Sequence, residues 1–197
     1  MKVGTKSVLF GVHCVLIHPF FLARAWWMLH GFPSDPRLWV AFFVHDLGYL
    51  GKPNMDGPQG ERHVLLGGRI MGWLFGPKWR DFVLCHSRHW AQRAGKRYSK
   101  LCVADKLAFV LTPAWLYIPM ARWSGELREY MRVAGARQAG GRFTEFELSL
   151  LVSSDPYAWL AGLKSYTRRW VERHRNGGPD LWTVVRSRRP QGETCGL

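Results

Sequence analysis

Six histidine and aspartate side chains between residues 18 and 105 are of the types that bind divalent cations without sulfur. An adjacent pair, His45 and Asp46, ends an apolar run and is followed at once by a glycine-punctuated turn. Neighbouring helical side chains point about 100° apart, so this pair converges on one point only near a helix end, with partners from other segments. Imidazoles and carboxylates suit Fe, Mn, Mg, Co or Zn in a catalytic role. The other candidate ligands are His18, His63, His86 and Asp105.

The number of candidate ligands exceeds what one open catalytic ion requires. We therefore expect two divalent ions that share Asp46 as a bridging ligand. His89 follows His86 closely and is a spare ligand. A single histidine is more often a packing or surface residue, and His13, His30 and His174 are interpreted in that way.

The first two expected helices carry three of the ligands. A long amphipathic helix is expected over residues 6–29, with His18 in its middle and Pro19 kinking or breaking it there. The next helix, capped by Ser34 or Asp35, runs to the pair at 45 and 46. A helix end therefore presents the pair.

The loop that follows the pair is expected to form the rim of a pocket. Turn-forming residues fill 52–60, and a helix beginning near Glu61 places His63 in its first turn. Glycines at 67, 68 and 72 weaken that helix by propensity, so their expected use is close helix packing.

Two further helices supply the remaining ligands. One begins at Pro77 and carries His86 and His89. After a basic loop, a second helix over residues 99–111 carries Asp105.

Downstream, prolines punctuate an aromatic segment, and no internal repeat or period-two alternation is present. The fold class is therefore all-α. The later helices are expected near 125–134, 144–152 and 156–175, and a basic, flexible tail at 176–197.

Composition indicates a folded body with polyanionic partners. The 197 residues are 47% hydrophobic, which excludes a disordered chain, and the formal net charge is +14. Such a charge favours nucleotides, nucleic acid or an anionic surface as partners. We expect a helical body over 1–175, with a metal-site core at about 8–112.

The cysteines and the apolar segments bear on location. None of the four cysteines forms a C-x-x-C pair, so a thiolate zinc site or redox motif is not expected. Charged and histidine residues interrupt the apolar segment from 8 to 32, so no transmembrane segment is expected. The chain shows no secretory signal, and a cytoplasmic location is expected.

The order His, His-Asp, His, His and Asp resembles the HD superfamily of metal-dependent phosphohydrolases. The two histidines between the pair and the last aspartate are similar to its dinuclear branch, to which the HD-GYP phosphodiesterases belong, although their Gly-Tyr-Pro motif is absent here. The resemblance implies an HD-domain helical bundle with additional C-terminal helices. The matching stretches are His18–Ala25, Phe43–Gly48, His63–Ile70, His86–His89 and Val103–Ala108.

The resemblance also implies roles for individual residues. One ion would be held by His18, His45, Asp46 and Asp105, and the second by Asp46, His63 and His86. A bridging hydroxide would attack a phosphomonoester or phosphodiester, such as a nucleotide. Lys52, Arg88 and Lys106 would neutralise phosphoryl oxygens, and His89 would act as general acid or as a further ligand.

Two other functions fit the same residues. Some members of the superfamily hold a mixed-valent di-iron pair that activates dioxygen, and Tyr49 would then gate the substrate. A non-catalytic, basic nucleic-acid-binding module is the third hypothesis. Its metal site would be structural or vestigial, and its binding would depend on salt.

Overall fold

The computed structural model describes residues 1–56, 59–141 and 153–175, and all regular structure in these ranges is helical. The all-α fold class is therefore confirmed. The helices are α1 (Val3–Phe10), α2 (His18–His30), α3 (Pro36–Val44), the 3₁₀ turns η1 (Leu47–Tyr49) and η2 (Gly60–His63), α4 (Val64–Phe75), α5 (Pro77–Leu84), α6 (Arg88–Arg93), α7 (Lys100–Leu111), α8 (Ala114–Ser124), α9 (Glu126–Ala139) and α11 (Pro156–Arg175).

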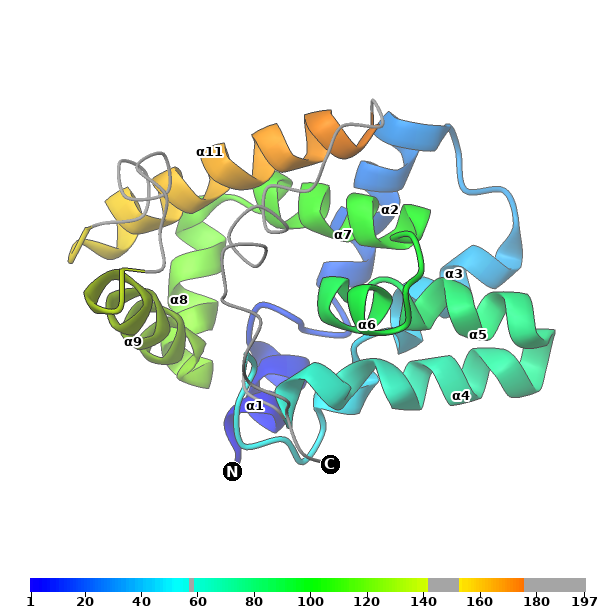
Figure 1. Cartoon of the computed structure of the whole chain (residues 1–197), viewed down its shortest axis with the longest axis horizontal. Helices are drawn as coiled ribbons and strands as arrows, with labels where there is room; N and C mark the ends of the chain where they lie inside the picture. The colour runs from blue at the N-terminus through cyan, green and yellow to red at the C-terminus, as the bar shows by residue number, and fades with distance from the viewer. Residues whose placement is uncertain (57–58, 142–152, 176–197) are drawn as a thin grey trace.

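The larger hydrophobic core lies among α2, α3, α4, α5 and α7. Leu22, Phe42, Met71 and Leu101 are fully buried in it. Helices α4 and α5 lie side by side at one end of the molecule, while α7 packs against α2 (Figure 1). This core fixes the helices that carry the candidate ligands.

A second core lies at the opposite end. Tyr117 and Ile118 of α8, Leu127 of α9, and Trp159 and Leu160 of α11 are buried together there. Helix α11 runs along α7 and also reaches α8 (Figure 1). The metal-site core is thus joined to a C-terminal helical layer.

The long helix expected over 6–29, with a kink or break at Pro19, is two separate helices, and the break lies earlier, between Phe10 of α1 and His18 of α2. The amide of Gly11 donates to the carbonyls of Lys6 and Ser7 and ends α1. A Cβ at Gly11 would overlap the Glu126 carboxylate, so this position is a close packing point. Pro19 lies in the first turn of α2, where a missing amide is tolerated, and His18 begins the helix instead of lying in its middle.

The helix expected to carry both His86 and His89 is also two helices. Helix α5 ends at Leu84, and α6 begins after Ser87, whose side chain accepts a hydrogen bond from the Trp90 amide at 3.2 Å. This N-cap leaves His86 in the turn between the helices. The aromatic segment is likewise helical, since α8 continues through Pro119.

Other expectations are confirmed. Asp35 caps α3 by accepting a hydrogen bond from the Arg37 amide, and α11 spans the expected residues 156–175. Cys14, Cys85 and Cys102 are buried free thiols. The helix expected at 144–152 and the tail at 176–197 lie outside the described residues.

The length and hydropathy of the described helices were also compared with those of a membrane-spanning helix. None of them alone is long and apolar enough to cross a membrane, although α7 and α8, joined by a bend of 103°, reach the required length and composition together.

Candidate metal centre

The six predicted ligands meet in one buried cluster. The first group contains His18, His45, Asp46 and Asp105, and the second contains Asp46, His63 and His86. Within each group, the ligand atoms lie within 4.8 Å of one another. They come from the start of α2, the end of α3, the end of η2, the α5–α6 turn and the middle of α7. The structure therefore brings together the six side chains that were predicted from the sequence to meet.

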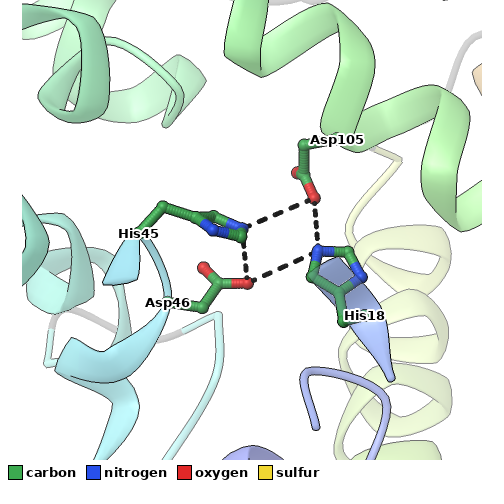
Figure 2. Close-up of side chains that lie close together, drawn as sticks. All are labelled: His18, His45, Asp46 and Asp105. Atoms are coloured by element: carbon green, nitrogen blue, oxygen red, sulfur yellow. Dashed lines mark hydrogen bonds and ion pairs between the residues drawn. The ribbon is translucent and has the colours of Figure 1, made fainter. Parts of the chain in front are cut away.

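The first group forms a closed arrangement of imidazole nitrogens and carboxylate oxygens (Figure 2). The Nε2 atom of His18 lies 3.1 Å from Asp105 Oδ1 and 3.8 Å from Asp46 Oδ2. The Nε2 atom of His45 lies 3.0 Å from Asp46 Oδ2 and 4.0 Å from Asp105 Oδ1. Four ligand atoms thus face one small volume.

The second group lies on the other side of the Asp46 carboxylate. Asp46 Oδ1 lies 3.6 Å from His63 Nε2 and 3.4 Å from His86 Nε2. Its Oδ2 atom faces the first group. One carboxylate therefore presents one oxygen to each group, as a bridging ligand does.

Three of the imidazoles are oriented by their other ring nitrogen. The Nδ1 atoms of His45, His63 and His86 lie 3.0, 2.7 and 2.6 Å from main-chain carbonyls three residues earlier in the chain. A carbonyl only accepts, so each Nδ1 carries the proton and donates it. In the neutral form of each ring, the Nε2 atom is then left with a lone pair directed into the cluster, which is the usual arrangement of metal-binding histidines.

Two observations show that the cluster fits divalent cations. The buried Nε2 atom of His45 has no hydrogen-bond partner, despite its proximity to Asp46. The Nε2 atoms of His63 and His86 lie 3.2 Å apart, so two lone pairs face each other. A cation bound between these nitrogens and the carboxylates would satisfy them, and a donor set of nitrogen and oxygen suits the metals expected from the sequence.

Electrostatics keep most of these groups in the state that binds metal. Burial would raise the pKa of Asp46, but the charges of His45 and His13 hold it well below its usual value. Lys106 and His18 do the same for the pKa of Asp105, against its burial. Burial and His86 lower the pKa of His63 to about 3. The carboxylates are therefore ionised and His63 is neutral near pH 7.

Glycines bring the helix ends close enough to form the cluster. A Cβ at Gly67 of α4 would lie 2.5 Å from the carbonyl oxygen of Val44 and 3.0 Å from the Cα of His45. A Cβ at Gly48 would overlap the main-chain carbonyl of His63. The predicted use of Gly67 in close packing is confirmed, and it sets the position of His45.

A cavity of about 840 Å³ opens onto the cluster and is named the larger cavity. Asp46, His63 and His86 line it together with Arg88, His89 and Lys106, three of the side chains with predicted catalytic roles. The Nζ atom of Lys106 also donates to Asp105 Oδ2 at 2.8 Å. Arg88 and Lys106 therefore place two positive charges beside the cluster.

The remaining predicted cation, Lys52, lies elsewhere. Its carbonyl accepts a hydrogen bond from the Gly4 amide at 3.1 Å, so this segment packs against α1. Lys52 does not line the larger cavity. The structure thus brings Arg88, His89 and Lys106 to the cluster but not Lys52.

Sequence analysis missed a pair formed by the partly buried His13 and the buried Glu126 at the cavity wall. His13 Nδ1 lies 2.9 Å from Oε1 of Glu126, which is fully buried and also accepts a hydrogen bond from Ser7 Oγ at 2.7 Å. Burial would lower the pKa of His13, but the Asp46 charge and the Glu126 hydrogen bond raise it to about 9. The partners are 113 residues apart, so no local motif signals them.

The chain was compared with known proteins in three ways. No family model, curated protein or solved structure matched it. The geometry and chemistry of the cluster therefore carry the functional argument.

Proposed function

We propose that this protein is a metal-dependent phosphohydrolase of the HD superfamily, of the branch that binds two ions. The observation that carries the proposal is the position of Asp46, whose two carboxylate oxygens face two separate groups of ligands. The order of the ligands along the chain, which resembles that superfamily, supports the same assignment. The substrate would be a phosphomonoester or a phosphodiester.

The residues around the cluster have distinct roles in this reaction. Bound divalent cations supply a water nucleophile of lowered pKa and neutralise charge on the phosphoryl group. Lys106 and Arg88 line the larger cavity and bind the non-bridging phosphoryl oxygens. His89, on α6 at the same cavity, donates a proton to the leaving oxygen.

The test is hydrolysis of a generic aryl phosphate and an aryl phosphodiester by the full chain loaded with Mn, Co or Mg. We expect turnover that falls by at least about 100-fold in Asp46→Asn, because the side chain loses its negative charge and one of its two metal-binding oxygens. Full activity in Asp46→Asn contradicts the proposal.

Two other outcomes identify the alternatives. Oxygen uptake with iron but not manganese, without ester hydrolysis, identifies a di-iron oxygenase. Salt-dependent binding of oligonucleotides without turnover identifies a binding module. Either outcome replaces the phosphohydrolase assignment.

A further inference from the structure

A second cavity of about 280 Å³ adjoins the metal cluster on the side of the first ligand group. We name it the aromatic cavity, because Phe109, Tyr117, Tyr130 and Trp159 line it. Its volume is close to the lower end of the range for ligand pockets, about 300–1,000 Å³. That size suits one ring system instead of a long chain or a whole dinucleotide.

The aromatic cavity and the larger cavity meet at the metal site. His18 and Asp105, two ligands of the first group, line the aromatic cavity. Arg88, Lys106 and Tyr49 line both cavities. A single molecule with an anionic end and an apolar end could therefore place its anion beside the cluster and its apolar part between α8, α9 and α11.

The walls of the aromatic cavity are held in place by packing. The rings of Phe109 and Tyr117 meet edge to face at 5.3 Å between centroids, and those of Tyr130 and Trp159 are stacked at 6.4 Å. Tyr117 and Trp159 also belong to the second hydrophobic core. Such walls favour a planar aromatic guest, since rings pack edge to face or offset against other rings.

We propose that the aromatic cavity binds an aromatic ring in the alcohol part of the phosphate ester. This inference rests on the proposed function and names its substrate class: aromatic phosphate esters over small aliphatic ones. The phosphoryl group lies beside Asp105 and Lys106, and the ring lies against Phe109 and Trp159. After cleavage of the ester bond, the aromatic alcohol leaves from this cavity.

The test compares the binding of two phosphonates, which cannot be hydrolysed at the ester position, to the full chain loaded with manganese. Benzylphosphonate carries a ring, and methylphosphonate does not. Burial of a phenyl ring predicts that benzylphosphonate binds roughly 10–100-fold tighter in calorimetry. Equal affinities, or no detectable binding of benzylphosphonate, overturn the proposal.

A matched pair of variants locates the ring. Ala134 of α9 lines the aromatic cavity, and Ala136 on the same helix is exposed. Ala134→Trp fills the cavity, so it removes the preference for benzylphosphonate and keeps the affinity for methylphosphonate. Ala136→Trp keeps both the preference for benzylphosphonate and the affinity for methylphosphonate. An unchanged preference in Ala134→Trp places the ring elsewhere and overturns the proposal.

The two proposals fail in different ways. If aryl and alkyl phosphates are hydrolysed with equal efficiency and benzylphosphonate is not bound more tightly, the phosphohydrolase assignment stands. The proposal that the aromatic cavity determines substrate specificity is then wrong. If Ala134→Trp abolishes a preference for benzylphosphonate but no ester is hydrolysed, the aromatic cavity does bind a ring. The phosphohydrolase assignment is then wrong. Rates for phenyl and nucleoside phosphates then show whether a carbocyclic or a heterocyclic ring is preferred.

Discussion

The Nε2 atoms of His63 and His86 lie 3.2 Å apart, while both Nδ1 atoms contact main-chain carbonyls. Because each Nδ1 donates its proton outward, both inner nitrogens present lone pairs to the same point. Only a cation or a shared proton satisfies both. Neither ring belongs to the first ligand group, so the pair offers ligands for a second ion beside that group.

We expect His63→Ala to reduce the manganese stoichiometry from two ions per chain to one, with the ion in the first group retained. His86→Ala should have the same effect, because both rings serve the same ion. Calorimetric titration of the metal-free protein measures the number of sites. The control is His30→Ala, which removes an exposed histidine at the end of α2. Two sites in both His63→Ala and His86→Ala would exclude this pair as ligands.

Lys106→Met should lower kcat/KM for an aryl phosphate by about 10–100-fold, because a charge-assisted hydrogen bond to the phosphoryl group is lost. Steady-state kinetics at saturating manganese measures the effect, and the metal stoichiometry should stay at two. Lys52→Met is the matched control, since Lys52 lines neither cavity. Equal losses in the two variants would show a general charge effect instead of a local contact.

The His13–Glu126 pair predicts a loss of stability at alkaline pH. The pKa of His13 is about 9 in the folded protein and ordinarily 6.5, so the folded state binds the extra proton. The stabilisation is complete below pH 6.5 and is lost as the pH rises through about 9. We expect the free energy of unfolding of the metal-free protein to fall by on the order of 1–3 kcal/mol across this window.

Urea unfolding at pH 6.5 and 9.5 measures this loss. The metal-free protein is required because bound cations would offset the Asp46 charge that helps to raise the pKa of His13. His13→Gln removes the titrating ring, so its pH dependence over the window should be flatter than that of the wild type. Parallel pH profiles for the two proteins would be inconsistent with a protonated His13.

Gly67→Ala should destabilise the protein by about 1–3 kcal/mol and weaken metal binding, because the added methyl group meets Val44 and the His45 backbone. Gly135→Ala in α9 is the opposite case. A Cβ at Gly135 meets nothing within 4 Å, so this change should stabilise by about 0.5–1 kcal/mol. Denaturant unfolding of both variants is the measurement. Stabilisation by Gly67→Ala would refute the close-packing account.

The positions of His45 and Asp105 among the candidate ligands could be predicted because the local sequence fixes the helices on which they depend. Asp35 and Pro36 start the helix that ends immediately before His45, and Ser99 caps the helix that carries Asp105. The types of the candidate ligands and their order along the chain could therefore be identified from the sequence, before the distances between them were known. Metal identity and substrate do not follow from such local rules.

Two of the errors arose where packing against residues remote in sequence overrides the local pattern, and one arose from a local helix cap. The apolar run over 6–29 is interrupted at Gly11, which packs against Glu126 of α9. In the local sequence, only the glycine itself indicates this break. His86 leaves the helix because Ser87 caps the following one. His13 seemed an ordinary packing residue, since its partner is remote in sequence. Tertiary contacts decided the first and third cases, whereas a local helix cap decided the second.

Crystals of the full chain grown with manganese test the central claim most directly, through anomalous scattering. The account predicts two peaks within coordination distance of Asp46, one between His18, His45 and Asp105 and the other between His63 and His86. A single peak, no peak in the cluster, or peaks that do not contact Asp46 would contradict it.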